Sequence, residues 1–167
     1  VEEVGKKYNC TTTYTVVGSI YVARTMRELI ANGENVIIGG EGNGGIIYPN
    51  HQFCRDGGMS AATMLGFVAG KTEPLSKLIA ELPSFTMYQE KRKTAQAKEI
   101  VAHMKTYFAD CPIDDRDGMR ITRGGAWALI RPSGTEPLVR VFAESQDPAE
   151  AKTLLDEIFA EIKPYLE

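Results

Sequence analysis

Apolar side chains in the first half of the chain alternate between short runs and helical spacing. Thr, Tyr and Val dominate residues 10–17, which predicts a strand, and Gly18 opens a helix with Val22 and Met26 on its apolar face. Asn32-Gly33 ends this helix, because both residues tolerate a left-handed backbone. The other elements expected here are the tail of a helix in 1–8, short strands at 36–38 and 46–48, and helices at 60–68 and 74–82.

The second half shows a more regular pattern that begins after the expected domain boundary, Leu82-Pro83-Ser84. Its last helix has clear start signals: Asp147 as N-cap, Pro148 at the first position and Glu150 completing a capping box. The pattern predicts the order β-α-β-β-β-α, with a strand at 85–90, a helix carrying Ile100, Val101, Met104 and Phe108, and strands at 119–122, 126–130 and 138–144.

These elements predict two small units. Residues 1–83 form a domain of mixed helices and short strands, and residues 84–167 form an α+β domain with an antiparallel sheet and two helices. Hydrophobic residues make up 43% of the 167 positions, enough for a packed core. The apolar runs are too short to span a membrane, and no secretory signal precedes them.

Charge and cysteine content narrow the classes of function. The net charge is −3 and the basic residues are scattered, which argues against a nucleic-acid partner and requires a local site for any anionic ligand. Cys10, Cys54 and Cys111 fit neither a zinc site nor a disulfide framework, which favours a reducing cytoplasm.

A glycine-rich segment, Gly39–Gly45, lies between the two short strands of the first unit. It matches the dinucleotide pattern GxGxxG, but the extended Ile46-Ile47-Tyr48-Pro49 follows where that fold needs a helix. Glu41 and Asn43 offer a carboxylate and an amide that suit the vicinal hydroxyls of a sugar. A tight hairpin with solvated polar side chains stays open as the alternative.

A second candidate loop, Arg131-Pro-Ser-Gly-Thr-Glu-Pro137, lies between two predicted strands. Arg131 supplies a planar fork of donors, Ser133 and Thr135 supply hydroxyls, and Gly134 allows backbone N–H groups to converge on an anion. The alternative is a surface turn whose arginine forms an ion pair.

Both loops resemble those of the α-D-phosphohexomutases. Arg131-Pro-Ser-Gly-Thr-Glu-Pro-Leu-Val-Arg140 is similar to the phosphate-binding loop of the family's fourth domain, and Gly40-Glu-Gly-Asn-Gly-Gly45 is similar to the sugar-binding loop of its third. The resemblance covers nearly the whole chain. It implies that residues 1–83 are an incomplete three-layer α/β domain, the N-terminally truncated third domain of the family, and that residues 84–167 are the fourth domain.

The resemblance also implies an activity for the intact enzyme. Such an enzyme interconverts hexose 1-phosphates and 6-phosphates through a phosphoserine and a hexose 1,6-bisphosphate intermediate, with Mg²⁺ bound by an Asp-rich loop. Neither motif is found here and the chain starts at Val1, so we expect a fragment that needs the N-terminal domains as partners and is inactive alone. No catalytic residue and no metal site are expected within it. A stand-alone regulatory module that binds a sugar phosphate stays open as the alternative.

Residue by residue, the resemblance assigns roles to positions of both loops. Asn43 stands where the family commonly has Ser, Gly45 replaces a frequent His, and Arg140 is either a site residue or a cross-strand ion-pair partner. Outside the loops, we expect Asp56 to cap a helix and Trp127 to pack between sheet and helix. The implied sugar-binding residues are Glu41, Asn43, Gly44 and Ser19, and the implied phosphate-binding residues are Arg131, Ser133, Gly134 and Thr135.

Overall fold

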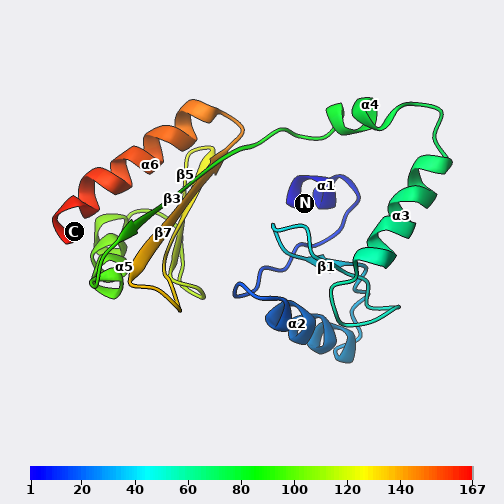
Figure 1. Ribbon diagram of the computed structural model, residues 1–167, viewed down its shortest axis with the longest axis horizontal. Coiled ribbons are helices and arrows are strands. Elements are labelled where there is room, and N and C mark those ends of the chain that lie inside the picture. The colour runs from blue at the N-terminus through cyan, green and yellow to red at the C-terminus, as the bar shows by residue number, and fades with distance from the viewer. Residues whose placement is uncertain (167) are drawn as a thin grey trace. The chain divides into compact units, whose positions relative to one another are not determined.

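A computed structural model describes residues 1–166 of the chain (Figure 1). The chain divides into two compact units, of which the first is Val1–Leu82 and the second begins at Pro83. Each unit is described by itself below. The mixed α/β fold that the sequence predicted is confirmed, and so is the antiparallel sheet expected in the second unit.

The first unit consists of helices around a two-stranded antiparallel hairpin. Strands β1 and β2 pair Gly39 with Ile47 and Gly40 with Ile46, so the glycine-rich segment is a hairpin connection. The elements of this unit are α1 (Glu2–Lys7), α2 (Ser19–Ala31), β1 (Gly39–Gly40), β2 (Ile46–Ile47), α3 (Gly57–Ala69) and α4 (Leu75–Ala80).

Helix α2 packs directly on the hairpin. Val22 and Met26 are buried in one cluster with Ile47, which is fully buried. A Cβ atom on Gly39 would lie 2.4 Å from the Sδ atom of Met26 and 2.9 Å from a methyl carbon of Val22. The absence of a side chain at position 39 is therefore what lets the helix approach the strand.

Two strand predictions in this unit are wrong. Residues 10–16 have no regular secondary structure, although their composition favours a strand, because a strand needs a neighbour for its backbone hydrogen bonds and this segment has no ladder in the described chain. The strand expected at 36–38 instead lies at Gly39–Gly40, and Ile37 and Ile38 are exposed.

The second unit is built on a five-stranded antiparallel sheet in the order β3-β7-β6-β5-β4. The short β4 was not predicted from the sequence. The elements are β3 (Thr86–Lys93), α5 (Ala97–Tyr107), β4 (Ile113–Asp114), β5 (Met119–Arg123), β6 (Ala126–Pro132), β7 (Leu138–Ser145), α6 (Pro148–Ile162) and the 3₁₀ turn η1 (Lys163–Tyr165).

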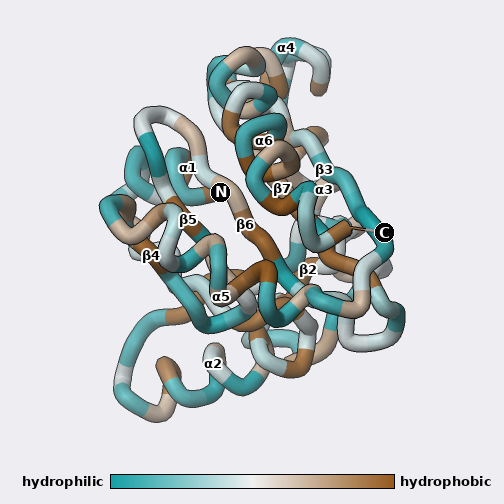
Figure 2. Tube along the Cα trace, turned by 90° about the vertical axis from the view of Figure 1, so that its left-hand side faces the viewer, coloured by the Kyte–Doolittle hydropathy of each residue, from teal (hydrophilic) through white to brown (hydrophobic). Residues whose placement is uncertain are grey.

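Both long helices of this unit cover the same face of the sheet. Alternate residues of β6 and β7 point toward them, as the period of a strand requires, and the hydrophobic stretch of β6 is visible in Figure 2. The core is formed by Ile100, Met104, Phe108, Met119, Ile121, Ala128, Ile130, Val139, Val141, Leu155, Ile158 and Ile162, all essentially inaccessible to solvent.

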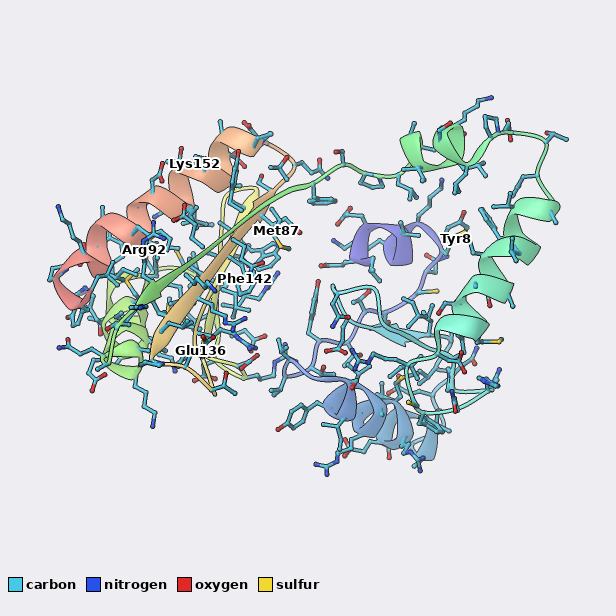
Figure 3. All side chains as sticks on the ribbon, in the orientation of Figure 1. Tyr8, Met87, Arg92, Glu136, Phe142 and Lys152 are labelled. Carbon is cyan, nitrogen blue, oxygen red and sulfur yellow. The ribbon has the colours of Figure 1, made fainter. Side chains whose placement is uncertain are left out.

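The other face of the sheet carries Trp127, so its expected position between sheet and helix is wrong. Trp127 alternates with the buried Ala126 and Ala128, and its Nε1 atom donates to Glu144 at 3.0 Å. The guanidinium of Arg120 lies 4.9 Å from its ring centroid. Met87 and Phe142 lie on this same face (Figure 3).

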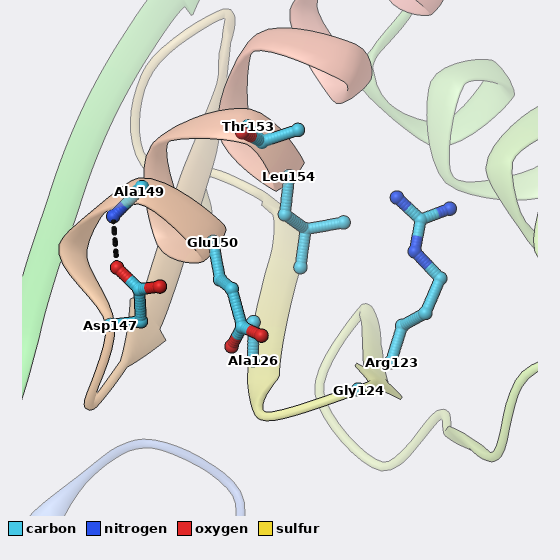
Figure 4. A pocket seen from close by; sticks show the side chains of 8 residues that line it. All are labelled: Arg123, Gly124, Ala126, Asp147, Ala149, Glu150, Thr153 and Leu154. Carbon is cyan, nitrogen blue, oxygen red and sulfur yellow. Dashed lines mark hydrogen bonds between the residues drawn. The ribbon is translucent and has the colours of Figure 1, made fainter.

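The N-terminus of α6 is capped as predicted, but without a capping box. Asp147 accepts the backbone N–H of Ala149 at 2.8 Å (Figure 4). Glu150 was expected to accept the N–H of Asp147; that N–H instead donates to Ser145 Oγ at 3.1 Å, and Ser145 in turn donates to Glu150 at 3.0 Å. The hydroxyl of Ser145 thus takes the place of the carboxylate.

This cap gives a first testable prediction. Asp147→Ala should lower the free energy of unfolding of the second unit by about 1 kcal/mol, a typical cost of losing an N-cap. Trp127 is the single tryptophan, so its fluorescence during urea unfolding reports on this unit. Asp156→Ala is the control: it removes an exposed pair with Lys152 on the same helix and should cost less than about 0.5 kcal/mol. Equal losses would contradict the capping role.

Candidate functional site

The glycine-rich hairpin is closed by its own backbone and by one side chain. The N–H of Glu41 donates to the carbonyl of Gly45 at 2.9 Å, and the N–H of Gly44 donates to that of Glu41 at 3.1 Å. Gly44 has a φ of 90°, which a residue with a side chain rarely adopts. Asn43 Oδ1 accepts the N–H of Gly45 at 3.1 Å. The amide of Asn43 therefore shapes the turn as well as offering a polar group to a ligand.

A hollow of about 560 Å³ lies beside this hairpin and brings together three of the four predicted sugar-binding residues, Ser19, Asn43 and Gly44. Ser19 reaches it as the first residue of α2. The remaining lining comes from the hairpin and from the start of α3: Gly45, Ile46, Cys54, Arg55, Asp56, Gly57 and Ser60.

Glu41 does not line this hollow but contacts a residue that does. Its carboxylate is only 15% exposed, and Oε2 lies 3.2 Å from Nη1 of Arg55. The angle at this contact is too poor for a hydrogen bond, so Oε2 is buried without a hydrogen-bond partner among the described residues. Arg55 is 46% exposed and lines the hollow, so it links the carboxylate of Glu41 to it.

Asp56 is an N-cap, as predicted, and also binds two side chains of the preceding loop. Oδ1 accepts the N–H of Met59 at 2.8 Å, while Oδ2 accepts from Gln52 at 2.7 Å and lies 3.1 Å from Nε2 of His51. The Met59 N–H, and after it His51, lower the pKa of Asp56 below its ordinary value of 3.8. The carboxylate is held in place at the edge of the hollow.

The predicted phosphate loop connects β6 and β7 at the end of their ladder. The N–H of Ser133 donates to the carbonyl of Leu138 at 2.9 Å and fixes the start of the turn. Gly134 and Thr135 are exposed. Gly134 has a φ outside the left-handed region, and an added Cβ would meet open space. The turn in this conformation therefore does not require glycine at position 134.

Two arginines lie side by side at the base of this loop. Arg131 on β6 pairs with Arg140 on β7 in the ladder, so both side chains are on the face opposite the helices. Nη1 of Arg131 lies 2.8 Å from Asp117, and Nη2 of Arg140 lies 3.5 Å from Glu136. In each arginine the Nε atom is buried and has no hydrogen-bond partner within the described chain. Two neighbouring cations with unused donors favour an anion between or beside them.

The sequence analysis missed Arg55 and Asp117. Arg55 precedes the N-cap of α3, and Asp117 precedes a turn at Gly118 that rests on Arg131. A Cβ on Gly118 would lie 2.4 Å from the carbonyl oxygen of Ile130 and 2.8 Å from Cβ of Arg131. An Asp-Gly turn signal was present in the sequence, but nothing in the pattern indicated which arginine the turn would contact.

A second hollow, of about 360 Å³, lies in the second unit, at the end of the sheet opposite the predicted phosphate loop (Figure 4). It is lined by the β5–β6 turn and the first turns of α6, including Arg123, Asp147 and Glu150. Since β6 runs from Ala126 at this end to Pro132 at the phosphate loop, the two regions are separated by the length of the strand.

Two kinds of feature are absent from residues 1–166. No three His, Cys, Asp or Glu side chains are grouped there so that they could hold a metal ion. Nor does any helix in that range combine the length and the apolar character needed to cross a membrane.

Each of the two units matches one domain of the same protein family. Residues 1–85 match the family model of phosphoglucomutase/phosphomannomutase α/β/α domain III, and residues 88–161 match that of the C-terminal domain. The chain belongs to the α-D-phosphohexomutase family.

Curated relatives support the same assignment. A probable phosphoglucosamine mutase of Methanopyrus kandleri is 34% identical over 94% of this chain and 34% of its own length. A phosphoglucosamine/phosphogalactosamine mutase of Sulfurisphaera tokodaii is 34% identical over 95% of the chain and 35% of its own length, and a phosphoglucomutase/phosphomannomutase of Thermococcus kodakarensis is 32% identical over 93% and 34%. The chain thus spans about a third of these relatives.

A solved structure shares the fold. The phosphoglucomutase/phosphomannomutase family protein of Burkholderia thailandensis superposes with a TM-score of 0.71 at 19% identity, over 99% of this chain and 41% of that protein.

The Asp56 cluster gives a second prediction. Because the folded pKa of Asp56 is lowered, the stability that its carboxylate contributes is present above pH 3.8 and is lost as the pH falls through the folded value. His51→Gln should raise this pKa but leave it below 3.8, since the Met59 N–H remains. Carboxyl ¹³C shifts during an NMR titration measure it. Asp114, whose pKa Arg116 lowers to about 2, should not change and serves as the internal control. An unchanged Asp56 pKa would show that His51 has no influence.

Proposed function

We propose that this chain supplies the sugar-binding and phosphate-binding domains of an enzyme that interconverts hexose 1-phosphates and 6-phosphates. The domains would be residues 1–83 and 84–167. The observation that supports the proposal most is the adjacent Arg131 and Arg140 at the base of the Ser133–Pro137 loop, each with a buried Nε donor that has no hydrogen-bond partner in residues 1–166. A phosphate offers the charge and the several acceptor oxygens that such donors match.

The two loops divide the recognition of one substrate. In a mutase of this kind the sugar must bind in two opposite orientations, so that each end in turn meets the phosphoserine. Glu41, with Ser19, Asn43 and Gly44, would contact ring hydroxyls that stay near the centre when the sugar turns. Arg131, with Ser133, Gly134 and Thr135, would hold whichever phosphate is not reacting. These contacts bind and orient the substrate; they do not transfer the phosphoryl group.

The transfer itself is assigned to the remaining domains of the same enzyme. They would contribute the phosphoserine and the Mg²⁺ site, and a hexose 1,6-bisphosphate would be the intermediate. Helix α3 supports the need for such partners: it buries none of its described residues and exposes Met64, Leu65 and Phe67 by 51%, 71% and 48%. An apolar helix surface of this kind suits contact with another domain. The three free cysteines fit a cytoplasmic enzyme.

The phosphate loop gives the test of this function. In the enzyme with all its domains, Arg131→Ala should weaken substrate binding roughly ten- to hundredfold, the effect of losing ~1.5–3 kcal/mol of charged hydrogen bonding, and Arg131→Lys should lose less because it keeps the charge but not the fork. The loss should be equal for 1-phosphates and 6-phosphates, as steady-state kinetics in both directions would show.

Arg123→Lys is the matched control, because Arg123 lies at the other end of the sheet, where it pairs with Glu157. Inorganic phosphate titrated into the 167-residue chain should shift the NMR signals of Ser133 to Thr135. An effect on one regioisomer alone, or shifts confined to other residues, would overturn the phosphate assignment.

The sugar loop gives a separate prediction. Glu41→Gln should lower kcat/KM for every hexose phosphate roughly ten- to hundredfold, since the amide replaces one charged acceptor by a donor at a cost of ~1.5–3 kcal/mol. Glu73→Gln is the control, because Glu73 pairs with Lys77 on an exposed surface. Unchanged kinetics for Glu41→Gln would mean that the segment is only a hairpin.

A further inference from the structure

Arg55 occupies space that is open only because residue 45 is glycine. A Cβ atom on Gly45 would lie 2.2 Å from Cδ of Arg55 and 3.1 Å from its Cγ. Both are atoms in the middle of the arginine side chain, so they cannot move aside without moving the guanidinium as well. Gly45 has a φ outside the left-handed region, so its backbone would accept alanine. The obstacle at position 45 is therefore the side chain of Arg55.

The path of Arg55 across Gly45 ends at Glu41. Nη1 of Arg55 lies 3.2 Å from Oε2 of Glu41, which has no hydrogen-bond partner among the described residues although it is buried. A buried carboxylate oxygen without a donor is costly, and a nearby guanidinium reduces that cost. An arginine side chain also loses considerable conformational entropy when it is fixed. The space left by Gly45 already accommodates the side chain of Arg55, which favours its pair with Glu41.

We propose that Arg55 is a positioning residue for Glu41, and that Gly45 is the permissive position on which this role depends. The proposal rests on the proposed role of Glu41 in sugar binding. By taking one oxygen of the carboxylate, Arg55 fixes its orientation and leaves the other oxygen for a ring hydroxyl. Gly45, Arg55 and Glu41 then form one coupled unit, in which a change at any member reaches the sugar through the carboxylate.

A double-mutant cycle on the full enzyme tests the coupling, with binding of glucose 1-phosphate measured by calorimetry. Arg55→Ala should weaken binding about tenfold, because the buried carboxylate of Glu41 loses the opposite charge that lies beside it. Gly45→Ala should weaken it by a similar factor, because it displaces Arg55. In the Arg55→Ala background, Gly45→Ala should change binding less than about twofold, since sites acting through one contact are not additive. Gly42→Ala is the control, because a Cβ there meets open space.

A second cycle separates positioning from direct contact with the ligand. If Arg55 acts through Glu41, Arg55→Ala should have little further effect on binding in the Glu41→Gln background. In the enzyme that retains Glu41, Arg55→Lys should restore part of the binding that Arg55→Ala loses. Full additivity of Arg55→Ala with Glu41→Gln would mean that Arg55 binds the ligand itself, and full additivity with Gly45→Ala would remove Gly45 from the mechanism; either result overturns the proposal.

The outcomes also distinguish this proposal from the function on which it rests. Normal binding by Glu41→Gln would refute the sugar-loop function, whereas weak binding by Glu41→Gln with normal binding by Arg55→Ala would refute only the positioning role. A readout without ligand is the Nε–H NMR signal of Arg55 in the 167-residue chain. It should shift in Glu41→Gln and in Gly45→Ala but stay unchanged in Gly42→Ala, and an unshifted signal in Gly45→Ala would contradict the coupling.

Discussion

The antiparallel pairing of β6 with β7 is the interaction on which the second unit depends. Seven residue pairs, from Ala126 with Ser145 to Pro132 with Val139, fix which side chains face the helices and which do not. A slip of one residue would exchange the two faces, bringing Arg131 into the apolar core. The same register that buries the core residues of these strands therefore places Arg131 beside Arg140 on the open face. One ladder therefore sets both the packing of the core and the position of the candidate anion site.

The first unit has no comparable ladder, and its site is shaped by close approaches at glycine. Two residue pairs join β1 and β2. Gly39 allows α2 to lie on the hairpin, and Gly45 leaves room for Arg55. At each of these glycines, the space that a side chain would fill is occupied by a side chain from another segment of the chain. A loop built in this way has few backbone constraints, so its polar groups depend on side-chain contacts such as that between Arg55 and Glu41.

The sequence predicted most elements of the second unit because their signals are local. Strand alternation and the Asp147-Pro148 start of α6 are visible within a few residues. Predictions failed where a distant partner decides the outcome. Residues 10–16 have strand composition but no ladder, and Trp127 was placed by its size although the β6 alternation turns it to the open face. The candidate loops were predictable from their residues; the partners of Arg131 and Glu41 were not.

These differences bear on how the two loops would act on a sugar phosphate. At the phosphate loop, Asp117 and Glu136 each hold one arginine, which keeps two like charges on adjacent strands tolerable in the absence of an anion. An arriving phosphate would add the acceptors that their Nε donors lack. At the sugar loop the charge is reversed, since a carboxylate is held by an arginine. The phosphate loop thus presents two arginines and the sugar loop one carboxylate, each beside a partner of opposite charge, so that less ordering is required when a ligand binds.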